Sequence, residues 1–257
     1  MSSKIRTAQI CSVLLFPMIM SPAVAETLWS KNSLSYLKNT SDFEVLTNDS
    51  INVFTLEHTS GHNWGDVFMF MDRIDAKADK QNPEHKETYG EVSARLSLDY
   101  ALGIKLPIPA LSDTFVASMW EHSTVSESDF SQGFDNYLLG FGTSWQVPGF
   151  NFFNANVYAS NNELVDNDVQ LTVAWGYPIE FGNHKFMFDG YFDWASAADD
   201  HAADFHFNPQ FRVDVGNYFG NPNTIDVGIE YSYWRNKFGI EGLDNESVVS
   251  LMVKLYL

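Results

Sequence analysis

The chain has 257 residues with 15 basic and 33 acidic side chains, so its formal net charge is −18. This acidic balance argues against nucleic acids and anionic membrane surfaces as partners. No stretch after the N-terminal segment approaches about 18 consecutive apolar residues, which excludes a helical membrane protein, and the 15% aromatic and 19% charged residues are unusual for a soluble protein.

The first 25 residues predict a cleaved export signal. Lys4 and Arg6 supply the positive start, Ile10 to Met20 the apolar stretch, and Ala23 to Ala25 a small-residue cleavage site. The alternative is an N-terminal membrane anchor, but the apolar stretch is too short to span a bilayer. Cys11 lies inside this segment, so the mature chain would hold no cysteine and could form no disulfide.

From residue 33 onward, apolar and polar side chains alternate with the period of a β-strand. The strand 204–215 is the clearest case, with Phe205, Phe207 and Phe211 on one face and Arg212 on the other. We expect twelve strands, at 33–45, 50–59, 64–75, 88–100, 113–122, 134–146, 150–160, 166–178, 185–195, 204–215, 224–235 and 246–257. Each strand would present an apolar face, and the sequence offers no second layer of structure to pack against it. These apolar faces must therefore contact lipid.

Residues 26–257 are therefore expected to form one all-β domain, a transmembrane antiparallel β-barrel with twelve strands. Twelve strands suggest a narrow lumen between the filled eight-stranded barrels and the open sixteen-stranded porins. A plugged barrel without conductance is the alternative. Pro209 cannot donate to the ladder, so we expect a bulge or an unpaired position there.

Short connections at 60–63, 147–149, 179–184 and 216–223 would lie on the periplasmic side with both termini. Longer, charged loops at 76–87, 123–132, 196–203 and 237–244 would lie outside, as this architecture requires. The connection at 101–112 is long and apolar for a periplasmic turn, and its role is not evident from the sequence.

The faces that point away from lipid would line the lumen. In 113–122 we assign Phe115, Ala117 and Met119 to lipid and Trp120 to the lumen, and in 64–75 we place the aspartate-bearing face inward. Flat rings among carboxylates and hydrogen-bonding groups suit the passage of a flat, hydroxylated solute. The predicted solute path is Asp66, Phe68, Phe70, Asp72, Glu91, Arg95, Trp120, Asp189, Tyr191, Asp193, Arg212 and Glu230.

Two plainer interpretations stay open for these residues. The rings could only fill lumen volume, and the basic residues Arg95, Lys185, Arg212 and Lys254 could only neutralise inward carboxylates.

Other kinds of chemistry receive little support. His201 and His206 lie near acidic residues, but their spacing matches no standard metal-ligand pattern. His58, His122 and Ser123 have no third partner for a hydrolase, and no nucleophile-elbow motif occurs. We therefore expect no metal, no cofactor and no enzymatic activity.

The chain resembles the nucleoside-specific channel-forming family of outer-membrane proteins, the Tsx and OmpK-like proteins. The resemblance is carried by Trp29 with 33–37, by 54–57, by the more specific 64–72 (Trp-Gly-Asp-Val-Phe-Met-Phe-Met-Asp), and more weakly by 134–142 and 253–257. It implies a monomeric twelve-stranded barrel that admits nucleosides through a lumen lined by aromatic and ionisable residues. We transfer this role only to Asp66, Phe68, Phe70 and Asp72.

Together these observations predict an outer-membrane channel for the diffusion of small hydrophilic solutes, most plausibly nucleosides. Its partners would be the solute, outer-membrane lipid and the barrel assembly machinery. The alternative hypothesis is a surface or bacteriophage receptor with little conductance, which would use the loops 76–87, 123–132 and 196–203.

Overall fold

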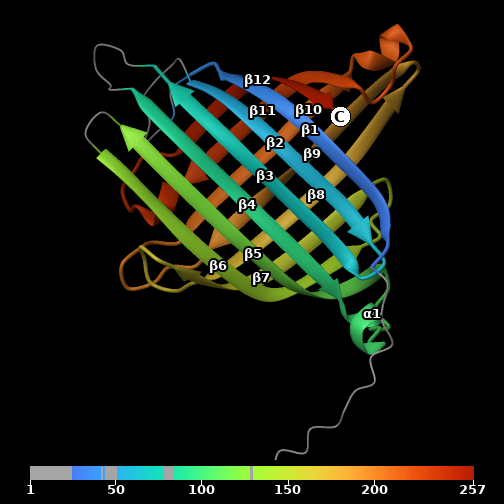
Figure 1. Ribbon diagram of the computed structural model, residues 1–257, viewed down its shortest axis with the longest axis horizontal. Helices are drawn as coiled ribbons and strands as arrows, with labels where there is room; N and C mark the ends of the chain where they lie inside the picture. The colour runs from blue at the N-terminus through green and yellow to red at the C-terminus, as the bar shows by residue number, and fades with distance from the viewer. Residues whose placement is uncertain (1–24, 42, 44–50, 78–83, 128–129) are drawn as a thin grey trace, which may run out of the picture.

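In the computed structural model, residues 25–41, 43, 51–77, 84–127 and 130–257 are described. Their strands close into one antiparallel barrel, in which each strand pairs with the next along the chain and the last pairs with the first (Figure 1). The expected twelve-stranded barrel is confirmed. The expected export signal, residues 1–25, lies outside the described residues apart from Ala25.

The strands are β1 (Thr27–Asn39), β2 (Ile51–His62), β3 (Gly65–Ala76), β4 (His85–Ser97), β5 (Leu111–Glu127), β6 (Phe130–Trp145), β7 (Phe152–Asn162), β8 (Val169–Phe181), β9 (His184–Ala195), β10 (Asp204–Asp214), β11 (Ile225–Arg235) and β12 (Glu246–Tyr256). The described parts of the connections contain three short helices: α1 (Leu98–Leu102), η1 (Gly216–Phe219) and η2 (Lys237–Gly239). Within the described ranges, no helix has the length and apolar character needed to cross a membrane.

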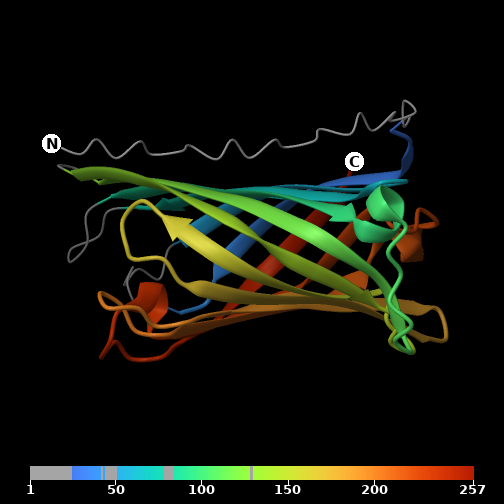
Figure 2. The ribbon, with the colours of Figure 1, turned by 90° about the horizontal axis from the view of Figure 1, so that it is seen from below.

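The two ends of the barrel differ (Figure 2). One end, which we call the α1 end, carries α1, the short turns after β2, β6 and β8, and the end of β12. The other end, the loop end, carries the connections after β1, β3, β5, β7, β9 and β11. This separation of turns and loops is the one expected from the sequence, with the α1 end on the predicted periplasmic side.

The connection after β4 begins as the helix α1. Ser97 starts it by accepting a hydrogen bond from the Tyr100 backbone N–H (3.2 Å), and Gly103 ends it in the left-handed conformation at a φ of 66°. Leu102 at its end and Ile104 and Leu106 beyond it are exposed. The long apolar connection seen in the sequence is thus a helical turn followed by an irregular segment.

Successive side chains point alternately outward and inward, because each strand is extended. Phe141 is 70% exposed and Leu251 is 58% exposed on the outer face, whereas Arg212 inside the barrel is 2% exposed. Phe211 lies on the outer face and stacks on Phe186 of β9 with ring centroids 5.5 Å apart. The outside is therefore apolar and the lumen is polar, as predicted.

Pro209 leaves a local gap in the ladder without shifting it. Between β10 and β11, the pairs Phe207↔Tyr233 and Gln210↔Glu230 keep one register, and no pair joins the strands between them. On the other side Pro209 pairs with Gly190, where an added Cβ would collide with the Asn208 carbonyl. The unpaired position that we expected at Pro209 is confirmed.

The orientation predicted for the fifth strand is wrong. Arg95 of β4 pairs with Ala117, and Val92 pairs with Trp120. Because paired residues point to the same side of the sheet, Ala117 faces the lumen with Arg95, and Trp120 faces outward with Val92. Both faces of this strand mix polar and apolar side chains, so alternation alone could not choose between them.

The first strand also differs from its prediction. β1 runs from Thr27 to Asn39, whereas the sequence suggested 33–45. Ser33, Ser35 and Leu37 are buried on its inner face, and its pairing with both β2 and β12 sets its limits.

An arginine on the outer face tests whether that face contacts lipid. Leu251→Arg, in the middle of β12, should lower the free energy of unfolding in lipid vesicles by about 2–4 kcal/mol, because the charge would enter hydrocarbon. The control Phe181→Arg, at the α1 end of β8, should cost about 0–1 kcal/mol. Urea titration measures the free energy of unfolding of both variants. An equally small loss in the two variants would argue against a lipid-facing surface.

Candidate functional site

The inner face of β3 carries an aromatic stripe. Phe68 and Phe70 have ring centroids 5.9 Å apart, and Phe70 lies 5.8 Å from Tyr89 of β4. The same inner face continues across β5 and β6 with Met119 and Leu138, which are both buried. This side of the lumen therefore offers flat and apolar side chains.

The far side of the ring, formed by β9 to β12, is polar. Gln210 donates to Glu230 (2.7 Å), and Tyr191 contacts His206, with ring centroids 5.3 Å apart. Asn208 is buried on the same inner face. The lumen is therefore two-sided in one respect: the Phe68, Phe70 and Tyr89 rings of β3 and β4 lie across the ring of strands from the hydrogen-bonding groups of β9 to β11.

Three basic residues on the inner face, Arg95, Arg212 and Lys254, lie near the α1 end, and each holds a carboxylate. Arg95 donates from Nε and Nη2 to both oxygens of Asp66, at 2.8 and 2.6 Å. Its guanidinium also lies 4.4 Å from the centroid of the Phe115 ring. A bidentate contact of this kind fixes the relative orientation of the two side chains and also pairs their opposite charges.

Arg212 makes the second such group. It donates to both oxygens of Asp189, at 2.6 and 2.7 Å, and to Asp226 at 3.3 Å. It also donates to Gln210. Lys254 makes the third group by donating to Glu57 at 2.9 Å. These contacts confirm that the three basic residues neutralise inward carboxylates; Lys185 forms no ion pair with any residue that the structure describes.

A second set of carboxylates lies away from these ion pairs and accepts hydrogen bonds from neutral groups. Thr55 donates to Asp72 (2.6 Å), Tyr89 donates to Glu91 (2.7 Å), and Thr172 donates to Asp193 (2.5 Å). These bonds orient the carboxylates, and none of the three donors carries a positive charge.

Of the residues predicted for the solute path, the structure places all except Trp120 on the inner face. Trp120 instead donates to Asp135 (2.8 Å) on the outside, near the loop end. The assignment of the other residues to solute passage stays a prediction.

Sequence reasoning missed two groups in the same region, Tyr89 and Glu121. Tyr89 lies only two residues before Glu91 on the same face, so continuing the alternation of that strand would have found it. Glu121 was missed because its strand was placed with the wrong face inward.

The two histidines considered for a metal site are not brought together. His206 stacks on Trp234 with ring centroids 3.9 Å apart, whereas His201 lies in the loop after β9. In the part of the chain that the structure describes, no group of three or more His, Cys, Asp or Glu side chains has an arrangement that could hold a metal ion.

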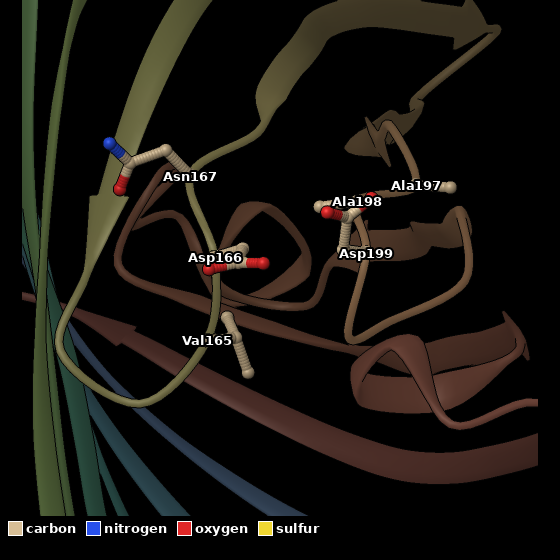
Figure 3. Close-up of a pocket in the computed structure, with 6 residues that line it drawn as sticks. All are labelled: Val165, Asp166, Asn167, Ala197, Ala198 and Asp199. Carbon is tan, nitrogen blue, oxygen red and sulfur yellow. The ribbon is translucent and has the colours of Figure 1, made fainter.

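The loops before β8 and after β9 meet at the loop end. Asp200 accepts from the Asp166 backbone N–H (3.0 and 3.2 Å), and His201 Nδ1 lies 2.7 Å from Asp200. His201 Nε2 lies 3.4 Å from Asp168. An open hollow of about 530 Å³ lies between these loops, lined by Val165 to Asn167 and Ala197 to Asp199, and contains none of the predicted path residues (Figure 3).

Burial lowers the pKa of His201, but the hydrogen bond to Asp200 and the charge of Asp168 outweigh it and raise the pKa above its ordinary value. The hydrogen bond from His201 lowers the pKa of Asp200. His201 therefore clamps the two loops, because it pairs with Asp200 of one loop and with Asp168 of the other.

A closed barrel with an apolar outer face and a lumen of charged and aromatic side chains belongs to the class of outer-membrane β-barrel channels. Within that class, the family model described as the nucleoside-specific channel-forming protein Tsx matches residues 32–252. The chain belongs to this family.

Comparison with solved structures finds other barrels of low sequence identity. The KdgM porin in complex with disordered oligogalacturonate has a TM-score of 0.45 at 10% identity, over 88% of this chain and 98% of that one. The β domain of the Bordetella autotransporter BrkA has a TM-score of 0.39 at 10% identity, over 88% of this chain and 98% of that one. Acinetobacter baumannii Omp33 has a TM-score of 0.36 at 11% identity, over 89% of this chain and 97% of that one. No curated protein sequence matches the chain.

Removing the Arg212 guanidinium should destabilise the barrel. Arg212→Gln leaves Asp189 and Asp226 without their cation inside the lumen, so we expect a loss of about 3–5 kcal/mol in the free energy of unfolding. Arg235→Gln, on the outer face at the end of β11, is the control and should change it by less than about 0.5 kcal/mol. Urea unfolding followed by tryptophan fluorescence measures both, and similar values would show that the buried pair adds no stability.

The His201 clamp should weaken as the pH rises. Because the pKa of His201 is higher in the folded loop than in the unfolded chain, its contribution is complete below about pH 6.5 and is lost as the pH rises through the folded value. Hydrogen exchange, corrected for its intrinsic pH dependence, should show faster opening of 163–168 and 196–203 at about pH 8.5 than at about pH 5.5. His201→Gln should abolish this difference, and a variant that keeps it would rule out the clamp.

Proposed function

We propose that the chain lets nucleosides diffuse across the outer membrane through its lumen. The observation that carries the proposal is the two-sided lumen, in which the Phe68, Phe70 and Tyr89 rings lie across from the hydrogen-bonding wall of β9 to β12. Membership of the nucleoside-specific channel-forming family supports the same solute.

A nucleoside has the two surfaces that such a lumen accepts. The flat base stacks on aromatic rings, and each base stacked in this way contributes about 1–3 kcal/mol in other proteins. The ribose hydroxyls can donate hydrogen bonds to carboxylates such as Glu230 and Asp193. Contacts of this strength slow and select a solute without trapping it, which is what passage by diffusion requires.

The aromatic stripe gives the most direct test. In a planar lipid bilayer, adenosine should reduce the ion current through the wild-type channel, because the bound base occupies the lumen. Phe70→Ala should weaken this block by about tenfold, equivalent to about 1.4 kcal/mol of lost stacking.

Phe141→Ala is the matched control, because Phe141 is 70% exposed on the outer face and should leave the block unchanged. Wild-type current that adenosine fails to reduce would overturn the nucleoside proposal. Equal block in Phe70→Ala and wild type would overturn the role of the stripe.

A further inference from the structure

We propose that the lumen conducts cations in preference to anions, and that five mid-lumen carboxylates set this preference. We call them the acidic belt: Asp72, Glu91, Glu121, Asp193 and Glu230. The proposal rests on the chain's function as a channel but not on the identity of its solute.

Three positive charges in the lumen lie at the same end. Arg95, Arg212 and Lys254 each lie two residues before the end of their strand, at Ser97, Asp214 and Tyr256 respectively. All three are therefore at the α1 end, and each is held by at least one carboxylate. Lys237 at the loop end is likewise held by Glu246 at 2.6 Å.

The acidic belt lies outside these ion pairs. In the described part of the chain, none of its five members forms an ion pair, and every hydrogen bond found for them comes from a neutral donor. Asn136 donates to Glu121 (2.9 Å) and Gln210 donates to Glu230 (2.7 Å), as Thr55, Tyr89 and Thr172 do to the other three.

Two members of the belt face each other directly. Glu91 and Glu121 are paired across β4 and β5 on the inner face. Like charges in directly opposed positions destabilise a sheet, and an amide at either position would keep the hydrogen bond without the repulsion. The pair therefore adds negative charge to the lumen at the expense of stability.

The effect on ions follows from this distribution. A permeating ion meets a ring of uncompensated carboxylates from β3, β4, β5, β9 and β11 in a passage with low-dielectric walls, and such rings select cations. Because the walls focus the field, the local concentration of cations rises and that of anions falls by about tenfold or more.

The test uses KCl alone, so its outcome is independent of the nucleoside proposal. In a planar bilayer with a salt gradient, the reversal potential of the wild-type channel should give a potassium-to-chloride permeability ratio above about ten. The variant Glu91→Gln/Glu121→Gln should lower this ratio severalfold while folding at least as stably as wild type.

Asp75→Asn is the matched control, because Asp75 lies three residues from Asp72 on β3 but on the outer face, so it removes the same charge without changing the ratio. If the double variant fails to fold, Asp193→Asn should independently lower the potassium-to-chloride permeability ratio. A wild-type ratio near or below one, an absence of conductance, or an unchanged ratio in both belt variants would overturn the proposal. Loss of cation preference with retained adenosine block would leave the nucleoside proposal standing.

Discussion

The closed ladder of backbone hydrogen bonds is the constraint on which the rest of this structure depends. Hydrocarbon offers no partner for a backbone N–H or C=O group, so a sheet can cross it only if its two edge strands pair. Here β1 and β12 pair from Ser33↔Tyr256 to Asn39↔Ser250. Once the ring is closed, every strand has one face toward lipid and one toward the lumen, and all the chemistry of the protein must lie on the second face.

The lumen accommodates buried charge in two ways. Near the α1 end, guanidinium and ammonium groups join carboxylates from neighbouring strands, so that Arg212 links β10 to both β9 and β11. In the middle, carboxylates accept hydrogen bonds from hydroxyl and amide groups, and among the described residues they form no ion pair. The first arrangement stabilises the wall, and the second leaves a negative field where a solute would pass beside the Phe68 and Phe70 rings.

Alternation predicted the inner face wherever the two faces of a strand differ sharply in polarity. In β10, aromatic residues alternate with His206, Gln210 and Arg212, so only one assignment avoids arginine in hydrocarbon. In β5 both faces are mixed, and Trp120 was assigned to the wrong side. There the side chain orientation follows from pairing with Arg95 and Val92 of β4, which the sequence of β5 does not contain.

The sequence by itself determined that the chain crosses a membrane as strands, which residues of most strands face inward, and which family it resembles. These depend on local alternation and short motifs, and both can be read along one strand. Only the tertiary structure decided which carboxylates receive a cation and which do not. Lys254 meets Glu57 across 197 residues of sequence because barrel closure places β12 beside β1, so that Lys254 reaches across β1 to β2, and no local pattern encodes such a pairing.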